Sequence, residues 1–190
     1  MESIWIDKIE VANRQISEAV TLFFESRDIV VIHTIIASAH QVLLDVGKES
    51  GIVSAIKNPE GMTRQKFRKH IRTINEPYNF FKHADNDPKG KINIAPLNRF
   101  ASDFILDAIL MLQNIAGELP LEAKVFWAWF VSTYPDEFDN CPEGGAIQNL
   151  MSMGLNEWDF PTIRQFLTFG EIMQEANKSK HSDSENAAGV

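Results

Sequence analysis

The chain of 190 residues has one cysteine, so it cannot form an internal disulfide, and a zinc site built from cysteines is not expected. Such a chain fits a reducing compartment. Cys141 lies beside Pro142 in an acidic loop, a setting that disfavours the thiolate, and we do not expect it to act as a nucleophile. The sequence also has no glycine-rich dinucleotide loop, no Walker loop, no Gly-x-Ser-x-Gly and no His-Glu-x-x-His. No cofactor is therefore predicted.

A secretory signal is also missing, because the first residues, MESIWIDKIE, have no basic segment followed by an apolar run. The longest apolar stretch covers residues 29–46, but it contains two histidines and has an acid near each end. Those groups are unfavourable in a bilayer, so the sequence predicts a buried core helix rather than a membrane span. We expect a soluble, cytoplasmic protein with no membrane partner.

Apolar residues recur at three- and four-residue steps through most of the chain, which predicts helices. Capping residues and breakers divide them into segments at about 6–24, 29–46, 63–84, 96–116, 120–134, 144–153 and 161–178. Ser26 or Asp28 caps the second segment, and Pro77 requires a kink or a break near Asn75 to Glu76 in the third.

The sequence therefore predicts an all-α fold, a bundle of about seven helices around a central buried helix. We expect one helical domain over residues 1–178. The polar residues 179–190 are expected to form a disordered tail.

Positive charge is scarce overall but concentrated in one segment. The net charge is −8, yet residues 57–91 hold nine basic residues and four acids, a local charge of +5. Such asymmetry is typical of a surface that meets an anionic partner. The alternative is that these basic residues pair with the acidic remainder of the chain inside the fold.

The predicted third helix carries a polar stripe beside an apolar one. Its members recur at steps of four, three, four and four: Arg68, Arg72, Asn75, Asn79 and His83. Arginine offers forked donors to phosphate, and histidine can move a proton near neutral pH. The candidate anion-binding residues are Arg68, Arg72 and Lys82. The candidate catalytic residues for phosphodiester cleavage are His83, Asn79 and Arg72. An ordinary solvated face is the alternative.

The loop after this helix carries His83, Asp85 and Asp87 at alternate positions, where an extended segment points its side chains the same way. A metal site is one interpretation, and closure of the turn before Pro88 by the aspartates is the other. A calcium loop of the EF-hand type is excluded, because a lysine and a proline occupy two of its ligand positions. We predict no metal.

Two further pairs contain groups that can bind ligands or protons. His33 and His40 are seven residues apart, about 10 Å along a helix, which is too far to share one metal. Either one of them meets a group from another helix, or both are core histidines bonded to their neighbours. Asp103 and Asp107 are four residues apart and could form a carboxylate pair.

The aromatic residues also allow more than one interpretation. Phe80 and Phe81 are expected to anchor the end of the third helix in the core. The run FWAWF, which contains Trp127 and Trp129, is expected to be core, or a partner surface if part of it is exposed.

The run INEPYNFFKHADNDP resembles a bacterial all-α family of uncharacterised function that carries an N-F-F-K-H-A-D-x-D-P block, here Asn79 to Pro88. Looser similarity, including IHTIIASAHQVLLDVG and GELPLEAKVFWAWF, covers most of residues 10–170. This resemblance implies a helical chain and no particular activity.

A second resemblance is to the HEPN helical domains, many of which are metal-independent ribonucleases that work as dimers. Their motif is an arginine followed after four to six residues by a histidine. In many of them a polar residue directly follows the arginine. Arg64 and His70 have this spacing, and Gln65 is the polar residue. Tyr78 and His83 also have it, with Asn79 as the polar residue, but tyrosine replaces the arginine. The resemblance implies His83 as the acid/base group, with Arg72 and Asn79 holding the phosphate.

Three hypotheses follow. The first is a cytosolic helical binding or regulatory module, expected to be a homodimer, whose basic stripe meets RNA, a nucleotide or an acidic protein. The second is a HEPN-like ribonuclease. The third is a purely structural protein, which an exposed aromatic patch around Trp127 and Trp129 would favour.

Overall fold

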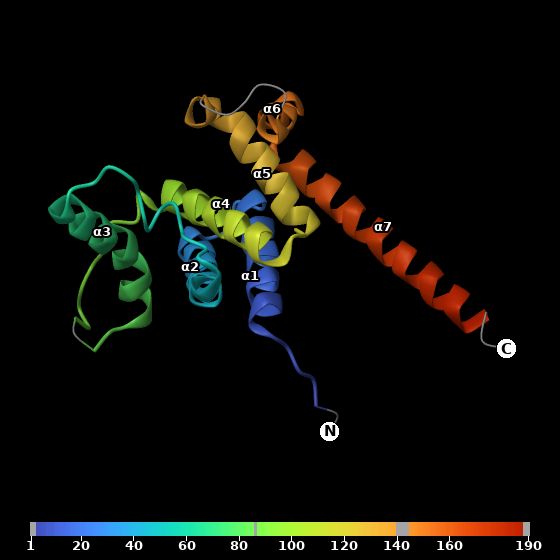
Figure 1. The fold of residues 1–190 in the computed structure, drawn as a ribbon, viewed down its shortest axis with the longest axis horizontal. Helices are drawn as coiled ribbons and strands as arrows, with labels where there is room; N and C mark the ends of the chain where they lie inside the picture. The colour runs from blue at the N-terminus through green and yellow to red at the C-terminus, as the bar shows by residue number, and fades with distance from the viewer. Residues whose placement is uncertain (1–2, 86, 140–144, 188–190) are drawn as a thin grey trace.

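The computed structural model describes residues 3–85, 87–139 and 145–187, with side chains as far as Met173. This part of the chain contains seven α-helices and no strand (Figure 1), so the predicted all-α bundle is confirmed. The helices are α1 (Lys8–Phe24), α2 (Ile29–Gly47), α3 (Arg64–Lys82), α4 (Leu97–Ala116), α5 (Leu121–Thr133), α6 (Ala146–Ser152) and α7 (Phe160–Ala187). Cys141 lies outside the described residues.

Side chains that precede the helices fix where they begin. The carboxylate of Asp7 accepts the amide of Glu10 at 2.8 Å, and Asp28 accepts the amide of Val30 at 2.8 Å. Each satisfies a backbone N–H that has no partner inside its helix. Of the two caps predicted for α2, Asp28 is therefore the one that is used, whereas Ser26 lies in the preceding turn with φ 53°.

The core lies where α2 packs between α1 and α4, as the sequence predicts for its most apolar helix (Figure 1). Ile36 and Leu43 of α2 are completely buried, and so are His33 and His40. With the short turn after it, this helix (Ile29–Ser50) is long and apolar enough to cross a membrane, and it alone passes that test in the described part of the chain. The core helix of a soluble protein passes the same test.

Aromatic rings join α1, α5 and α7. The ring centre of Phe23 lies 5.4 Å from that of Phe126 and 5.2 Å from that of Trp129, and Phe160 packs against the same group. Trp129 is buried and Trp127 is half-buried, so no exposed aromatic patch forms around this pair. The observation that would favour a purely structural protein is therefore not found.

Helix α3 stands at the edge of the bundle and contacts the core mainly through α2 (Figure 1). It does not break at Pro77: the helix is continuous from Arg64 to Lys82, and its ribbon bends part-way along. The buried side chains Ile74 and Pro77 hold this helix against the body. A proline ring inside a helix removes one backbone hydrogen bond, which explains a bend without a break.

At the other end of the molecule, α7 leaves the body and projects away from it (Figure 1). The helix reaches Ala187, nine residues beyond the boundary at 178 that the composition indicates. Residues such as Glu, Lys and Ala have good helix propensity, so a polar segment can continue a helix without burying a face.

Candidate functional site

The polar stripe of α3 lines one hollow in the surface, with a volume of about 790 Å³. All five residues of the stripe contribute to it: Arg68, Arg72, Asn75, Asn79 and His83. The remaining wall comes from Ile71, Glu76 and Phe80 of the same helix and from Asp85 and Asp87 of the loop that follows. The helical spacing seen in the sequence therefore produces a shared concave surface, which the sequence alone did not establish.

The loop after α3 returns beside the helix because of a tight turn. The amide of Gly90 donates to the carbonyl of Asp87 at 3.1 Å, and the Asp87 carboxylate folds over Gly90. A Cβ atom at position 90 would lie 2.2 Å from Asp87 Oδ2, so only glycine leaves this space free. His83 ends the helix, with its amide bonded to the carbonyl of Asn79 at 3.1 Å.

The two arginines of the hollow form no direct ion pair within the described part of the chain, although three carboxylates, Glu76, Asp85 and Asp87, line the same hollow. Neither Arg68 nor Arg72 forms an ion pair or a side-chain hydrogen bond there, and the other basic residues between 57 and 91 form no ion pair either. No ion pair therefore joins the +5 segment to the acidic remainder in this part of the structure, although Lys57 interacts electrostatically with Asp107 and Asp45. Exposed guanidinium groups of this kind can donate hydrogen bonds to phosphate or carboxylate oxygens.

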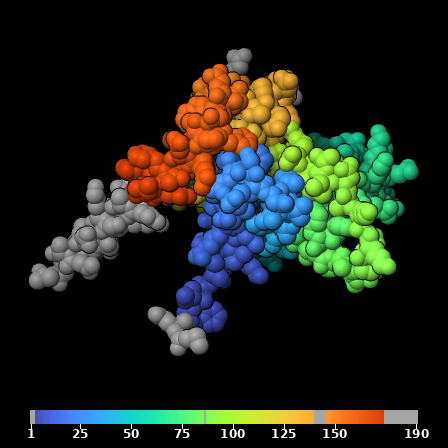
Figure 2. Space-filling model, turned by 180° about the vertical axis from the view of Figure 1, so that it is seen from behind, coloured from blue at the N-terminus to red at the C-terminus, as the bar shows by residue number. Residues whose placement is uncertain are grey.

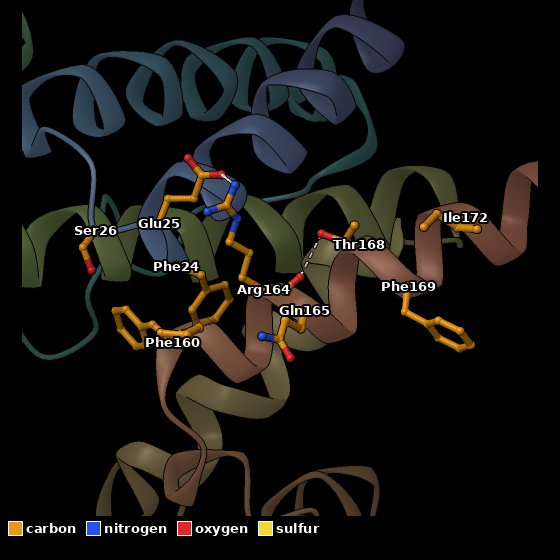
Figure 3. Close-up of a pocket in the computed structure, with 10 residues that line it drawn as sticks. Phe24, Glu25, Ser26, Phe160, Arg164, Gln165, Thr168, Phe169 and Ile172 are labelled. Carbon is orange, nitrogen blue, oxygen red and sulfur yellow. Dashed lines mark hydrogen bonds and ion pairs between the residues drawn. The ribbon is translucent and has the colours of Figure 1, made fainter.

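A second hollow, of about 600 Å³, offers a contrast (Figure 3). It lies between the end of α1 and the start of α7, with the rings of Phe24 and Phe160 on one side. Its arginine, Arg164, is bonded to Glu25 at 2.7 Å. Because that charge is already balanced, this hollow is a weaker candidate for an anion.

The three candidate catalytic residues do not meet at one point. Asn79 and His83 are one helical turn apart, whereas Arg72 and His83 are separated by eleven residues, about 16 Å along the helix. One phosphate group is too small to contact both, and a ligand that uses both ends of the hollow must be extended.

Phe80 is placed differently from the expectation. It is 37% exposed and lines the hollow, whereas Phe81 is half-buried with its ring 6.2 Å from that of His33. Phe81 belongs to the apolar stripe of α3, and its neighbour necessarily faces another direction. The helical period was therefore the signal that could have placed Phe80 on the polar side.

Lys82, the third predicted anion-binding residue, does not line the hollow. Its ammonium group lies 4.4 Å from the centre of the Tyr78 ring, a cation–π contact.

The two matches to the HEPN spacing gain no catalytic arrangement. In one of them, Tyr78 stands where that motif has an arginine. His70, the histidine of the other match, has its Nε2 atom 2.6 Å from the carbonyl oxygen of Ile56, so it fastens α3 to the preceding loop.

A buried cluster combines a serine, a histidine and an aspartate, but it is not arranged as a catalytic triad. Nε2 of His40 lies 2.7 Å from Asp107 Oδ2 and 3.2 Å from Ser54 Oγ, so both partners meet the same ring nitrogen. In a triad the base uses its two nitrogens for the two partners. All three side chains are buried, so the cluster is placed to hold its elements together.

The two pairs singled out in the sequence, the histidines of α2 and the aspartates of α4, have different partners in the structure. His40 does meet a group from another helix, whereas neither ring nitrogen of the buried His33 has a hydrogen-bond partner in the described structure. Burial lowers the pKa of His33 to about 4. Asp103 does not pair with Asp107, because Asp103 is bonded to Arg99 at 2.8 Å.

Among the described residues, no group of three His, Cys, Asp or Glu side chains is arranged to hold a metal ion. His83, Asp85 and Asp87 therefore remain polar members of the hollow. No protein-family model, curated protein or solved structure matches the chain, so its two resemblances gain no support from these comparisons.

Proposed function

We propose that the protein is a helical binding module whose α3 hollow holds an extended phosphate-bearing ligand, with single-stranded RNA as the best chemical fit. One observation supports this most directly: an exposed aromatic ring, Phe80, shares the hollow with the unpaired arginines Arg68 and Arg72. Stacking of bases on aromatic rings combined with arginine contacts to the backbone is the usual means of binding single strands.

The other groups of the hollow suit the same ligand. Asparagine side chains offer both donors and acceptors to base edges, and Asn75 and Asn79 lie between the two ends. The carboxylates of Asp85 and Asp87 accept hydrogen bonds only, which fits ribose hydroxyls or base amino groups and disfavours a second phosphate at that end. The mixed lining therefore supports a strand that presents phosphate to one end and sugar or base to the other.

The test is a fluorescence anisotropy titration of the full chain with labelled 12-nucleotide RNA of each homopolymer, repeated at several salt concentrations. We expect binding that weakens as salt rises, with a logarithmic slope of roughly −0.7 for each phosphate contact. Nucleoside monophosphates and an acidic peptide of equal charge are run as competitors. If the acidic peptide binds as tightly as RNA, the ligand is a protein. If none binds at 20 mM salt, the proposal is wrong.

A second candidate is metal-independent cleavage of RNA. The exposed His83 and its neighbour Asn79 lie in the same hollow, which favours this candidate. Two observations count against it: both residues are far from Arg72, and His70 is already bonded to the carbonyl of Ile56. It predicts cleavage in the presence of EDTA that disappears in His83→Ala while RNA binding and helical content remain. Binding without cleavage by the unmodified chain would exclude this activity.

A further inference from the structure

The described chain begins with an apolar arm that lies outside the bundle. Ile4 and Trp5 are 93% and 91% exposed, and Ile6 is 48% exposed. The arm extends away from the start of α1 and ends at Asp7, the cap of that helix (Figures 1 and 2). Large apolar side chains gain free energy when they leave water, so three adjacent exposed ones mark a segment that docks elsewhere.

A complementary pocket lies between α5, α6 and the start of α7. Its volume is about 540 Å³, within the range of pockets that enclose small ligands. Apart from one lysine, the residues that line the pocket are apolar, and those at its rim are exposed. The lining includes Lys124, Val125, Ala128, Met153, Trp158 and Phe166. The pocket has room for an indole and a neighbouring aliphatic side chain.

The arm cannot reach the pocket of its own chain. Ser17 of α1 bonds Glu122 at the start of α5, and Phe23 packs on Phe126 and Trp129, so α5 runs onward past the far end of α1. From Asp7 to Ser17 the helix rises about 15 Å, whereas three extended residues reach back only about 10 Å. The pocket begins at the level of Ser17 and lies beyond it.

We propose that the arm of one copy docks into this pocket of a second copy, and the reverse, giving a homodimer with exchanged arms. A two-fold dimer forms each such contact twice. Charge agrees with this choice: Lys124 forms no ion pair among the described residues, and an acid, Glu2, precedes the apolar residues of the arm in the sequence. The arm and the pocket share no residue with the α3 hollow.

The first test measures the association of the full chain by sedimentation across a range of concentrations. We expect a monomer–dimer equilibrium whose dissociation constant rises about 30-fold or more in Trp5→Ala, the effect of losing a central aromatic anchor. Ile94→Ala is the control, because Ile94 is also an exposed apolar residue, at 47%, and lies in neither surface. A monomer at all concentrations, or a dimer unchanged by Trp5→Ala, would overturn the proposal.

The second test identifies the contact itself. In a Cys141→Ser background, Ile4→Cys and Met153→Cys are prepared as separate proteins and mixed under mild oxidation. A disulfide-linked dimer that forms in the mixture, faster than in either protein alone, supports docking between copies. If the mixture forms no such product, or if a chain carrying both cysteines closes the disulfide only within itself, the second copy is not the occupant.

Discussion

Nε2 of His40 on α2 lies 2.7 Å from Oδ2 of Asp107 on α4, and both side chains are almost completely buried. Oδ2 of Asp107 also accepts the hydroxyl of Ser54, and its Oδ1 accepts the amide of Ala55 at 2.9 Å. One carboxylate thus joins two core helices to the loop that leads into α3. Because this loop is in turn bonded to His70 of α3, the cluster helps to set where the candidate hollow stands.

Removing this carboxylate should destabilise the whole fold. Asp107→Ala leaves the buried side chains of His40 and Ser54, and the part-buried amide of Ala55, without this acceptor, and we expect the free energy of unfolding to fall by about 3–5 kcal/mol. Denaturant unfolding followed by circular dichroism measures this. Asp103→Ala is the control, since its partly exposed pair with Arg99 should contribute no more than about 1 kcal/mol. Equal losses in the two variants would contradict the structural role of Asp107.

Acid should weaken the fold through His33. Burial lowers the pKa of this histidine from 6.5 to about 4, so between these values the unfolded chain binds more protons than the folded one. The stability that depends on neutral His33 is therefore fully present above about pH 6.5. It is lost as the pH drops toward 4, and the free energy of unfolding falls by on the order of 3 kcal/mol in all.

The variant His33→Phe should remove most of this pH dependence, because a phenyl ring fits beside Phe81 and Phe104 and does not titrate. Unfolding curves at pH 7.5 and pH 5 provide the measurement. Burial also lowers the pKa of His40, although its hydrogen bond to Asp107 opposes that shift, so a smaller dependence of the same sign should remain. A wild-type response in His33→Phe would show that the acid sensitivity arises elsewhere.

Two variants of the hollow separate charge from stacking. Arg72→Ala should weaken RNA binding at low salt and reduce the logarithmic salt slope by about 0.7, because one phosphate contact is lost. Phe80→Ala should cost about 1–3 kcal/mol of binding with the salt slope unchanged, whereas Phe80→Trp retains affinity.

Anisotropy titrations measure both effects. Arg164→Ala is a matched control, since it removes an arginine from the other hollow (Figure 3). If Arg164→Ala weakens RNA binding as much as Arg72→Ala does, the effect reflects overall charge and not the α3 hollow.

Gly47 at the end of α2 should not tolerate a methyl group. A Cβ atom there would lie 2.9 Å from Cβ of Ile52, an atom that cannot move without its backbone. Exchanging glycine for alanine near a helix end usually stabilises a protein by about 0.4–1 kcal/mol. Here we expect Gly47→Ala to destabilise by about 1–3 kcal/mol through overpacking, as measured by denaturant unfolding. Ser50→Ala, on the exposed turn that follows, is the control and should change stability by less than about 0.5 kcal/mol. If Gly47→Ala is instead more stable than the unmodified chain, the loop at Ile52 adjusts freely and the prediction is wrong.

The sequence by itself determined the helices, most of their ends and the polar face of α3. These features are local: a backbone hydrogen bond spans four residues, so spacing alone places Arg68, Arg72, Asn75, Asn79 and His83 on one side. Capping is local as well, because the Asp28 side chain bonds amides two and three residues away. The positive φ of Gly117, 76°, likewise ends α4 where the sequence predicts a stop.

Only the tertiary structure decided which of these side chains are buried, paired or free. Asp107 meets His40 across 67 residues of sequence, and nothing near either residue announces the other. Phe80 lines a hollow while Phe81 packs on the core, and within the described residues the arginines of α3 form none of the ion pairs that Arg164 and Arg99 form. Burial and pairing depend on which distant elements pack together, and that is settled by the free energy of the whole core and not by any local pattern.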